Sequence, residues 1–228
     1  ASCNDFLDRE PLDSVTPDNF FFTENDLAAY AVKHYNFTTH EGFNAGIWKN
    51  DNATDNQAAT DYDKKWIPGQ WKVPEAYDNP ASNDPWYFSA IREANYFLET
   101  VVPRFEKGEI EGSETNIKHY IGEMYFLRAK NYLSKLETFG DFPIIKNTLP
   151  DESESLIQAS KRAPRYKVAH FILEDLDQAI SLLTNNISGG KNRITRNAAL
   201  LLKSRAALFE ASWLTYHKGT ALVPGGPG

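Results

Sequence analysis

The residues best suited to recognising a ligand lie in one polar stretch that is rich in tryptophan. Trp48, Trp66 and Trp71 all fall between residues 38 and 84, among asparagine, aspartate, glycine and threonine. An indole ring offers a flat apolar face on which a sugar ring can stack, whereas a tryptophan buried in a core would serve packing alone. For each tryptophan considered alone, both interpretations, sugar stacking and core packing, stay open.

The same stretch, residues 38–84, shows neither helical nor strand periodicity. A loop of this length in a compact domain is usually either functional or disordered. Its many aromatic residues argue against disorder, because disordered segments are poor in aromatics. We therefore expect an ordered binding loop.

Motifs for most kinds of catalysis are absent from the sequence. There is no G-x-S-x-G turn, no G-x-x-x-x-G-K-[ST] loop and no G-x-G-x-x-G loop. The histidines never stand four residues apart, as a helical zinc site requires. The run 51–56 resembles a calcium loop, but Ala53 occupies a place that needs an oxygen ligand and no glycine follows. We expect no metal and no cofactor. A pair of carboxylates for glycoside cleavage stays open, because 31 acidic residues offer many pairs.

Composition narrows the classes of partner. The 228 residues carry 24 Lys and Arg against 31 Asp and Glu, a net charge of -7, and no basic cluster stands out. Nucleic acid is therefore an unsuitable partner, because neutralising phosphates supplies most of that affinity. No run of about 18 apolar residues exists, so no segment is predicted to span a membrane. The single cysteine, Cys3, excludes a disulfide within the chain.

Helical periodicity predicts an all-α fold. Thr23 begins a capping box, Pro164 can start a helix, and Thr195 is a candidate N-cap. The predicted helices cover residues 23–37, 86–102, 116–139, 164–183 and 195–213. Asn95 falls on the apolar stripe of the second helix, where we expect it to satisfy backbone groups instead of touching a ligand.

The strongest helix is the one within residues 116–145. Its apolar positions recur at three- and four-residue steps over a face too wide for a surface helix, so it should pack against several neighbours. Gly140 can take a positive φ at the helix end, and Pro143 prevents the helix from resuming.

This helix and its exit turn resemble the signature of the SusD/RagB family, the outer-membrane nutrient-binding lipoproteins of Bacteroidetes. The residues that carry the resemblance are Gly122, Glu123, Phe126 to Ala129, Tyr132, Phe139 to Asp141 and Pro143 to Ile145. Two helix pairs, in which Arg128-Ala129 and Tyr132 match Arg205-Ala206 and Phe209, are similar to tetratricopeptide units. The resemblance implies tetratricopeptide-like helical hairpins with a long aromatic-rich loop, as part of a larger SusD-like fold.

Family members are about twice as long as this chain, so it resembles their N-terminal half. The resemblance implies a lipid on Cys3, a tether over residues 1–22, and a first helix with the aromatic loop over 23–83. Helix pairs follow over 84–215, and residues 216–228 begin a C-terminal half. The protein would contact the membrane through this lipid alone.

The resemblance implies a cell-surface protein that captures an oligosaccharide or polysaccharide and passes it to a TonB-dependent SusC-like transporter, without breaking a bond. From composition we expect Trp66 and Trp71 to stack on the glycan, and Asn52, Asp55 and Asn56 to hydrogen-bond to it. Three alternatives remain. A peptide replaces the glycan, as in RagB-like relatives; the helices form a protein-interaction module; or the chain is a glycoside hydrolase.

Overall fold

A computed structural model describes residues 20–37, 56–57, 67–70, 86–187 and 192–223. Within these ranges the structure holds six α-helices and isolated bridges but no β-strand, which confirms the all-α prediction. The helices are α1 (Glu24–Lys33), α3 (Ser89–Glu106), α4 (Glu114–Phe139), α5 (Ser153–Ala159), α6 (Arg165–Leu182) and α7 (Arg196–His217).

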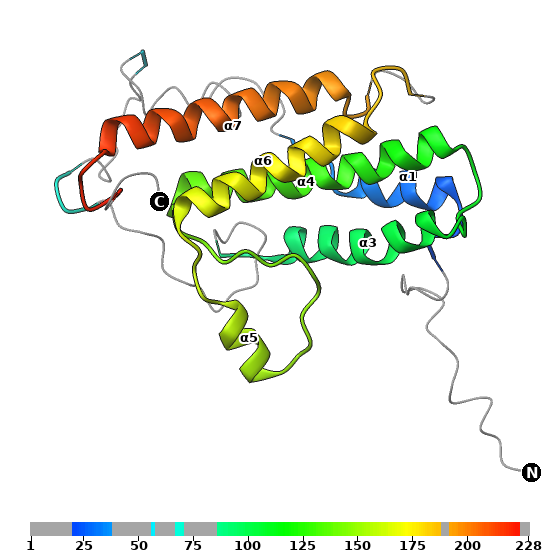
Figure 1. Ribbon diagram of the computed structural model, residues 1–228, viewed down its shortest axis with the longest axis horizontal. Coiled ribbons are helices and arrows are strands. Elements are labelled where there is room, and N and C mark those ends of the chain that lie inside the picture. The colour runs from blue at the N-terminus through cyan, green and yellow to red at the C-terminus, as the bar shows by residue number, and fades with distance from the viewer. Residues whose placement is uncertain (1–19, 38–55, 58–66, 71–85, 188–191, 224–228) are drawn as a thin grey trace, which may run out of the picture.

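The long helices form layers around α4 (Figure 1). Helices α1 and α3 pack on one side of α4, α6 packs on α4, and α7 packs mainly on α6. Consecutive long helices, α3 with α4 and α6 with α7, are therefore neighbours in space, as the predicted hairpins require. Outer helix α7 leaves Leu201 and Leu208 74% and 68% exposed.

The helix boundaries agree with the predicted caps at Thr23 and Thr195 and differ from the prediction at several other ends. Thr23 and Asp26 form the expected capping box, and Thr195 accepts a hydrogen bond from the backbone of Ala198. The prediction that the first helix reaches residue 37 was wrong, because α1 ends at Lys33 and the Tyr35 side chain turns to bond Glu123. The second helix was predicted over 86–102 but runs over Ser89–Glu106, and Pro103 lies inside its last turn.

Helix α4 is the central element because it is buried on nearly all sides. Its buried residues include Ile117, Met124, Leu127 and Tyr132. A Cβ at Gly122 would lie 3.0 Å from the Leu183 side chain, so glycine permits the close approach of the end of α6. Gly140 ends the helix with φ 73°, as predicted.

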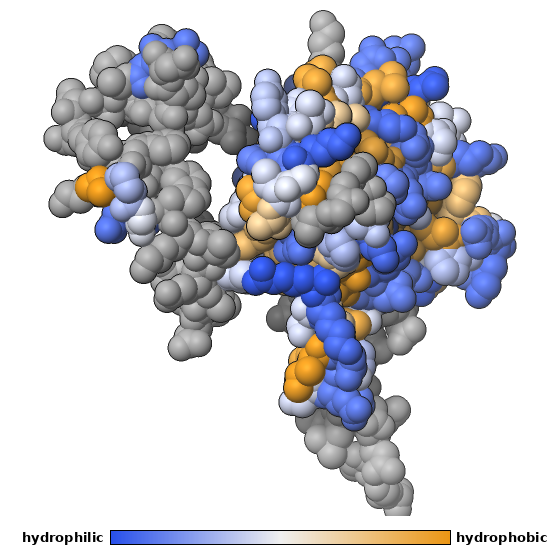
Figure 2. Space-filling view, turned by 60° about the vertical axis from the view of Figure 1, so that its left-hand side comes forward, coloured by the Kyte–Doolittle hydropathy of each residue, from blue (hydrophilic) through white to orange (hydrophobic). Residues whose placement is uncertain are grey.

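The short helix α5 was not predicted. It contains no buried residue, and Leu156 and Ile157 are 43% and 64% exposed. In Figure 2 it projects below the body of the molecule, with apolar and polar residues side by side. Seven residues span about two turns, too few for a hydrophobic period to stand out in the sequence.

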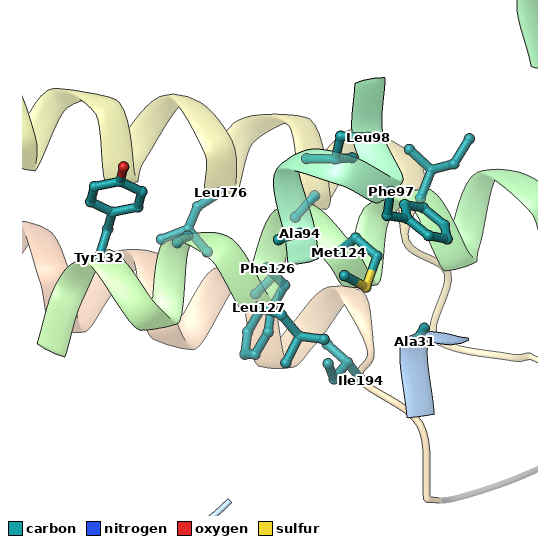
Figure 3. Packing of buried hydrophobic residues seen from close by; sticks show 14 of the residues in the cluster. Ala31, Ala94, Phe97, Leu98, Met124, Phe126, Leu127, Tyr132, Leu176 and Ile194 are labelled. Atoms are coloured by element: carbon teal, nitrogen blue, oxygen red, sulfur yellow. The ribbon is translucent and has the colours of Figure 1, made fainter. Parts of the chain in front are cut away.

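The core is a continuous cluster contributed by α1, α3, α4, α6 and α7. Figure 3 shows Phe97 of α3 and Met124 of α4 facing one another, with Ala31 of α1 nearby. Tyr132 and Leu176, on α4 and α6, are fully buried further along the same cluster. The helices are therefore joined by a shared apolar interior.

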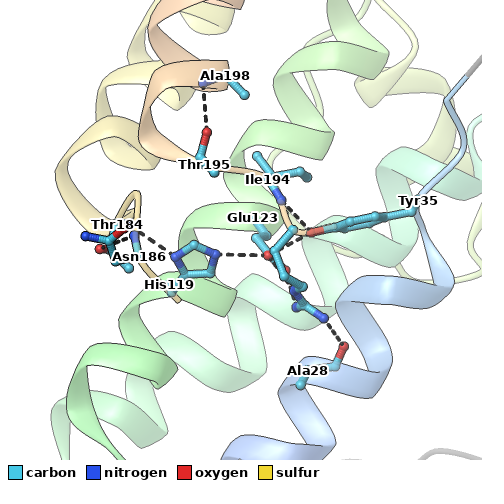
Figure 4. A network of polar contacts seen from close by, with 10 residues as sticks. Ala28, Tyr35, His119, Glu123, Thr184, Asn186, Ile194, Thr195 and Ala198 are labelled. Carbon is cyan, nitrogen blue, oxygen red and sulfur yellow. Dashed lines mark hydrogen bonds and ion pairs between the residues drawn. The ribbon is translucent and has the colours of Figure 1, made fainter. Parts of the chain in front are cut away.

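A buried polar network joins three of these elements (Figure 4). Glu123 of α4 is fully buried and accepts bonds from the Arg193 guanidinium at 2.5 and 2.9 Å and from the Tyr35 hydroxyl at 2.7 Å. The Thr184 backbone N–H donates to Nδ1 of His119, so Nε2 carries the hydrogen that His119 directs at Glu123, 3.1 Å away. Arg193 also reaches the carbonyl of Ala28 in α1.

Replacing Glu123 tests how far this network holds the layers together. In Glu123→Gln the buried Arg193 guanidinium loses its counter-charge, and breaking such a pair typically costs 3–5 kcal/mol. We expect the free energy of unfolding, measured by urea denaturation followed by circular dichroism, to fall by about 3 kcal/mol.

The matched control is Glu114→Gln, on the same helix, whose partner Lys118 is exposed. Exposed pairs contribute little, so this variant should unfold like the parent chain. Equal stability of the two variants would contradict a structural role for the buried pair.

Candidate functional site

A cavity of about 510 Å³ lies between the start of α3 and the chain that connects α4 to α6. Its first wall is one face of α3, formed by Phe88, Ile91, Arg92 and Asn95. These residues are spaced three and four apart, which places their side chains on the same side of a helix. The volume is within the range of about 300–1,000 Å³ that is common for ligand sites.

The second wall is the segment that leaves α4. Pro143, Ile145, Asn147 and Leu149 line the cavity, and the residues between them do not. This alternation is what an extended chain produces, because successive side chains point to opposite sides. The third wall comes from α5 and the residues after it, through Leu156, Ser160 and Arg162.

Asn95 fixes the second wall against the first. It is fully buried, and its Nδ2 donates to the carbonyls of Ile145 at 2.8 Å and Asn147 at 3.3 Å. Its Oδ1 accepts from Nη1 of Arg128 at 2.9 Å. The prediction that Asn95 satisfies backbone groups is thus confirmed, and those groups belong to the wall of the cavity.

Arg128 completes this junction. Its guanidinium binds both oxygens of Asp175 on α6, at 2.7 and 2.8 Å, and contacts the Lys146 carbonyl at 3.3 Å. Burial raises the pKa of the Asp175 carboxyl, and hydrogen bonding to Arg128 opposes that rise. Arg128 therefore links α4 to α3, to α6 and to the wall segment at once.

Two further contacts hold the wall segment in place. The Tyr132 hydroxyl accepts from the N–H of Ile145 at 2.8 Å and donates to its carbonyl at 3.1 Å. Burial raises the pKa of Tyr132 to about 12, so the phenol keeps its proton. The connection between α4 and α6 is closed near its two ends, where the backbones of Phe142 and Ala163 pair through two hydrogen bonds.

Aromatic rings and one arginine form the rim of the cavity. Trp86 packs on Phe139, with ring centroids 4.0 Å apart, and Phe88 stacks on Phe142 at 5.1 Å. The Arg162 guanidinium lies 5.0 Å from the centroid of the Trp86 ring. Trp86 and Phe88 are only half-buried, so part of each side chain remains accessible.

Most of the predicted contact residues lie outside the described residues. Trp66, Trp71, Asn52 and Asp55 are there, and so is Cys3. Asn56 is described, is exposed and has an interaction partner. The aromatic and amide contacts expected from this loop remain predictions.

The cavity residues were not predicted as a site. Two signals in the sequence pointed to them separately: the spacing of 88, 91, 92 and 95, and the alternation from 143 to 149. Neither pattern predicts that the two segments face one another. That juxtaposition depends on Arg128 and on the pairing of Phe142 with Ala163.

The described part of the chain holds neither a cluster of metal ligands nor a membrane-spanning helix. Within it, no three His, Cys, Asp or Glu side chains gather as metal ligands would. None of the helices in the described ranges has the length and apolar character needed to cross a bilayer.

Residues 5–208 match the model of a SusD-like family described as starch-binding and associating with the outer membrane. A curated relative, SusD-like protein P2 of Formosa agariphila, is 25% identical over 185 residues. The match covers 78% of this chain and 35% of that protein. The chain thus spans about a third of the length of this relative.

Two solved structures from Bacteroides fragilis share the fold. A SusD-like protein aligns with a TM-score of 0.65 at 25% identity, over 90% of this chain and 39% of that one. A SusD-like carbohydrate binding protein aligns with a TM-score of 0.64 at 18% identity, over 85% of this chain and 39% of that one. At 18% identity the second likeness bears on the fold alone.

Replacing Asn95 tests the junction behind the cavity. Asn95→Ala leaves the carbonyls of Ile145 and Asn147 without their amide donor and removes one partner of Arg128. The Ile145 carbonyl keeps the Tyr132 hydroxyl, and Arg128 keeps Asp175 and the Lys146 carbonyl, so the cost is that of three lost hydrogen bonds, each contributing about 0.5–1.5 kcal/mol. We expect the free energy of unfolding in urea to fall by about 2–3 kcal/mol.

Asn131→Ala on α4 is the matched control, because its side chain bonds only the Leu127 carbonyl within its own helix. Both substitutions gain the same helix propensity, so the difference between them measures the junction. A loss in Asn131→Ala as large as that in Asn95→Ala would contradict this account.

Proposed function

The chain belongs to the SusD-like family, and from this membership we propose that it binds a glycan at the outer membrane. The family description, starch-binding and associating with the outer membrane, supports both parts of this proposal. The observation that carries it is the cavity beside Trp86, where half-buried aromatic rings stand next to the exposed Asn147 amide. Aromatic faces and hydrogen-bonding groups together are what a sugar ring requires.

The rigidity of two cavity walls supports a binding role. Side chains of α3 and of residues 143–149 are held by the buried contacts of Asn95, Arg128 and Tyr132. A ligand that binds to such walls does not have to order them first, which lowers the entropic cost of binding. The arrangement suits capture of a ligand.

The aromatic loop adjoins this cavity along the chain. The loop, residues 38–84, ends two positions before Trp86 in the sequence, and Trp86 lines the cavity. We keep Trp66 and Trp71 as the proposed stacking residues, with Asn52, Asp55 and Asn56 as proposed hydrogen-bonding residues.

Capture is proposed to precede transport, with no bond broken. The ligand would pass to a SusC-like TonB-dependent transporter, and the protein would be held at the membrane by a lipid on Cys3. The tether over residues 1–22 and a C-terminal half beginning within 216–228 belong to the same proposal. These parts rest on the family resemblance.

Affinity gel electrophoresis against a panel of soluble polysaccharides tests the proposal, with reducing ends assayed in parallel. We expect at least one polysaccharide to retard the chain without new reducing ends. Trp66→Ala and Trp71→Ala should weaken retardation about threefold to tenfold, because one aromatic contact contributes about 0.5–1.5 kcal/mol beyond its buried area.

Trp213→Ala on α7 is the control, since Trp213 lies outside the cavity and packs beside His217. It should leave retardation unchanged once folding is verified by circular dichroism. New reducing ends would instead indicate a hydrolase. Absence of retardation by every polysaccharide would refute glycan binding and favour a peptide ligand.

A further inference from the structure

We propose that the cavity beside Trp86 selects an anionic sugar unit, one that bears a carboxylate or a sulfate group. This inference rests on the proposed function, glycan binding, and names the class of glycan. Its starting point is the charge of the lining. Arg92 and Arg162 both line the cavity, and no carboxylate is found among the described lining residues. The chain as a whole, by contrast, carries a net charge of -7.

These two arginines differ from the buried arginines of the fold. The two buried arginines and the half-buried Arg193 each have a carboxylate partner: Arg128 has Asp175, Arg165 has Glu210 and Arg193 has Glu123. Arg92 and Arg162 are exposed, and neither forms an ion pair with a carboxylate of the described residues. A single unpaired arginine on a surface is ordinary. Two that line one cavity create a local positive potential.

The neighbouring carboxylates of α3 are already engaged. Glu93 pairs with Nδ1 of His34 at 3.2 Å. Glu99 accepts bonds from the backbone N–H of Thr148, at 2.8 Å, and from the Thr148 hydroxyl. The hydrogen bond from His34 lowers the pKa of the Glu93 carboxyl, as expected for a carboxylate with a donor. These two acids serve structural contacts, and no ion pair joins either of them to Arg92 or Arg162.

The chemistry of the lining fits a charged sugar. A guanidinium group can hold a carboxylate or a sulfate through two parallel hydrogen bonds, and its charge persists at all physiological pH values. Trp86 and Phe88 can contact the apolar face of the ring, while the exposed Asn147 amide and the Ser160 hydroxyl can bond its hydroxyl groups. A neutral sugar would leave both arginines without a counter-charge.

Pairs of polysaccharides that differ only in charge test the inference. Dextran is compared with dextran sulfate, and methyl-esterified pectin with polygalacturonate, by affinity electrophoresis and isothermal titration calorimetry. We expect one charged polymer to bind at least tenfold more tightly than its neutral counterpart, and binding to weaken as NaCl is raised. The polymer that binds identifies the anion as sulfate or carboxylate.

Variants assign the effect to the cavity. Arg92→Gln and Arg162→Gln should each weaken binding of the charged polymer about tenfold, or about 1.4 kcal/mol, since each removes one charged hydrogen-bonding group. The double variant should remove the preference for charge. Arg196→Gln, an exposed residue on α7 outside the cavity, makes the same charge change and should bind like the parent chain.

Three outcomes would overturn the inference. If neutral and charged polymers bind equally, the inference fails and glycan binding stands. If Arg196→Gln weakens binding as much as the cavity variants do, the attraction is a general surface effect and the cavity is not the site. If no polymer of either kind binds, including the wider panel of polysaccharides, the proposed function itself fails.

Discussion

The buried guanidinium of Arg128 is the contact on which the described structure most depends. A charge removed from water is tolerated only when hydrogen bonds and a counter-charge replace its hydration. Asp175, Asn95 and the Lys146 carbonyl meet that requirement from α6, α3 and the wall segment respectively. Three elements must therefore reach one point before the charge can be buried. The same requirement places a wall of the cavity.

Other arginine–carboxylate pairs join neighbouring helices in the same way. Arg193 with Glu123 joins the start of α7 to α4 and α1, and Arg165 with Glu210 joins α6 to α7. The last junction is less complete, because Nη2 of Arg165 and Nε1 of Trp213 are buried without a hydrogen-bond partner. Leu201 and Leu208, on the opposite face of α7 from Glu210, are exposed. Among the long helices, packing is thus tightest around α4 and loosest at α7.

Sequence periodicity predicted the long helices because each buries a face with a 3.6-residue repeat. It predicted Asn95 as a packing residue for the same reason, since an amide on an apolar stripe needs partners. It missed α5, which buries no residue. The matched positions Arg128 and Arg205 look alike in sequence, yet one is buried and the other exposed. Only packing distinguishes them, and packing also creates the cavity from three separate segments.

The cavity joins walls of unequal rigidity. Side chains of α3 and of residues 143–149 are tied to the buried junction, whereas α5 packs against no other helix within the described residues. Leu156 is already partly exposed, so moving α5 would uncover little additional apolar area. Such a movement costs little free energy, because segments with few buried contacts open most easily. A ligand would therefore meet a fixed surface on the α3 side, and α5 could adjust to its size.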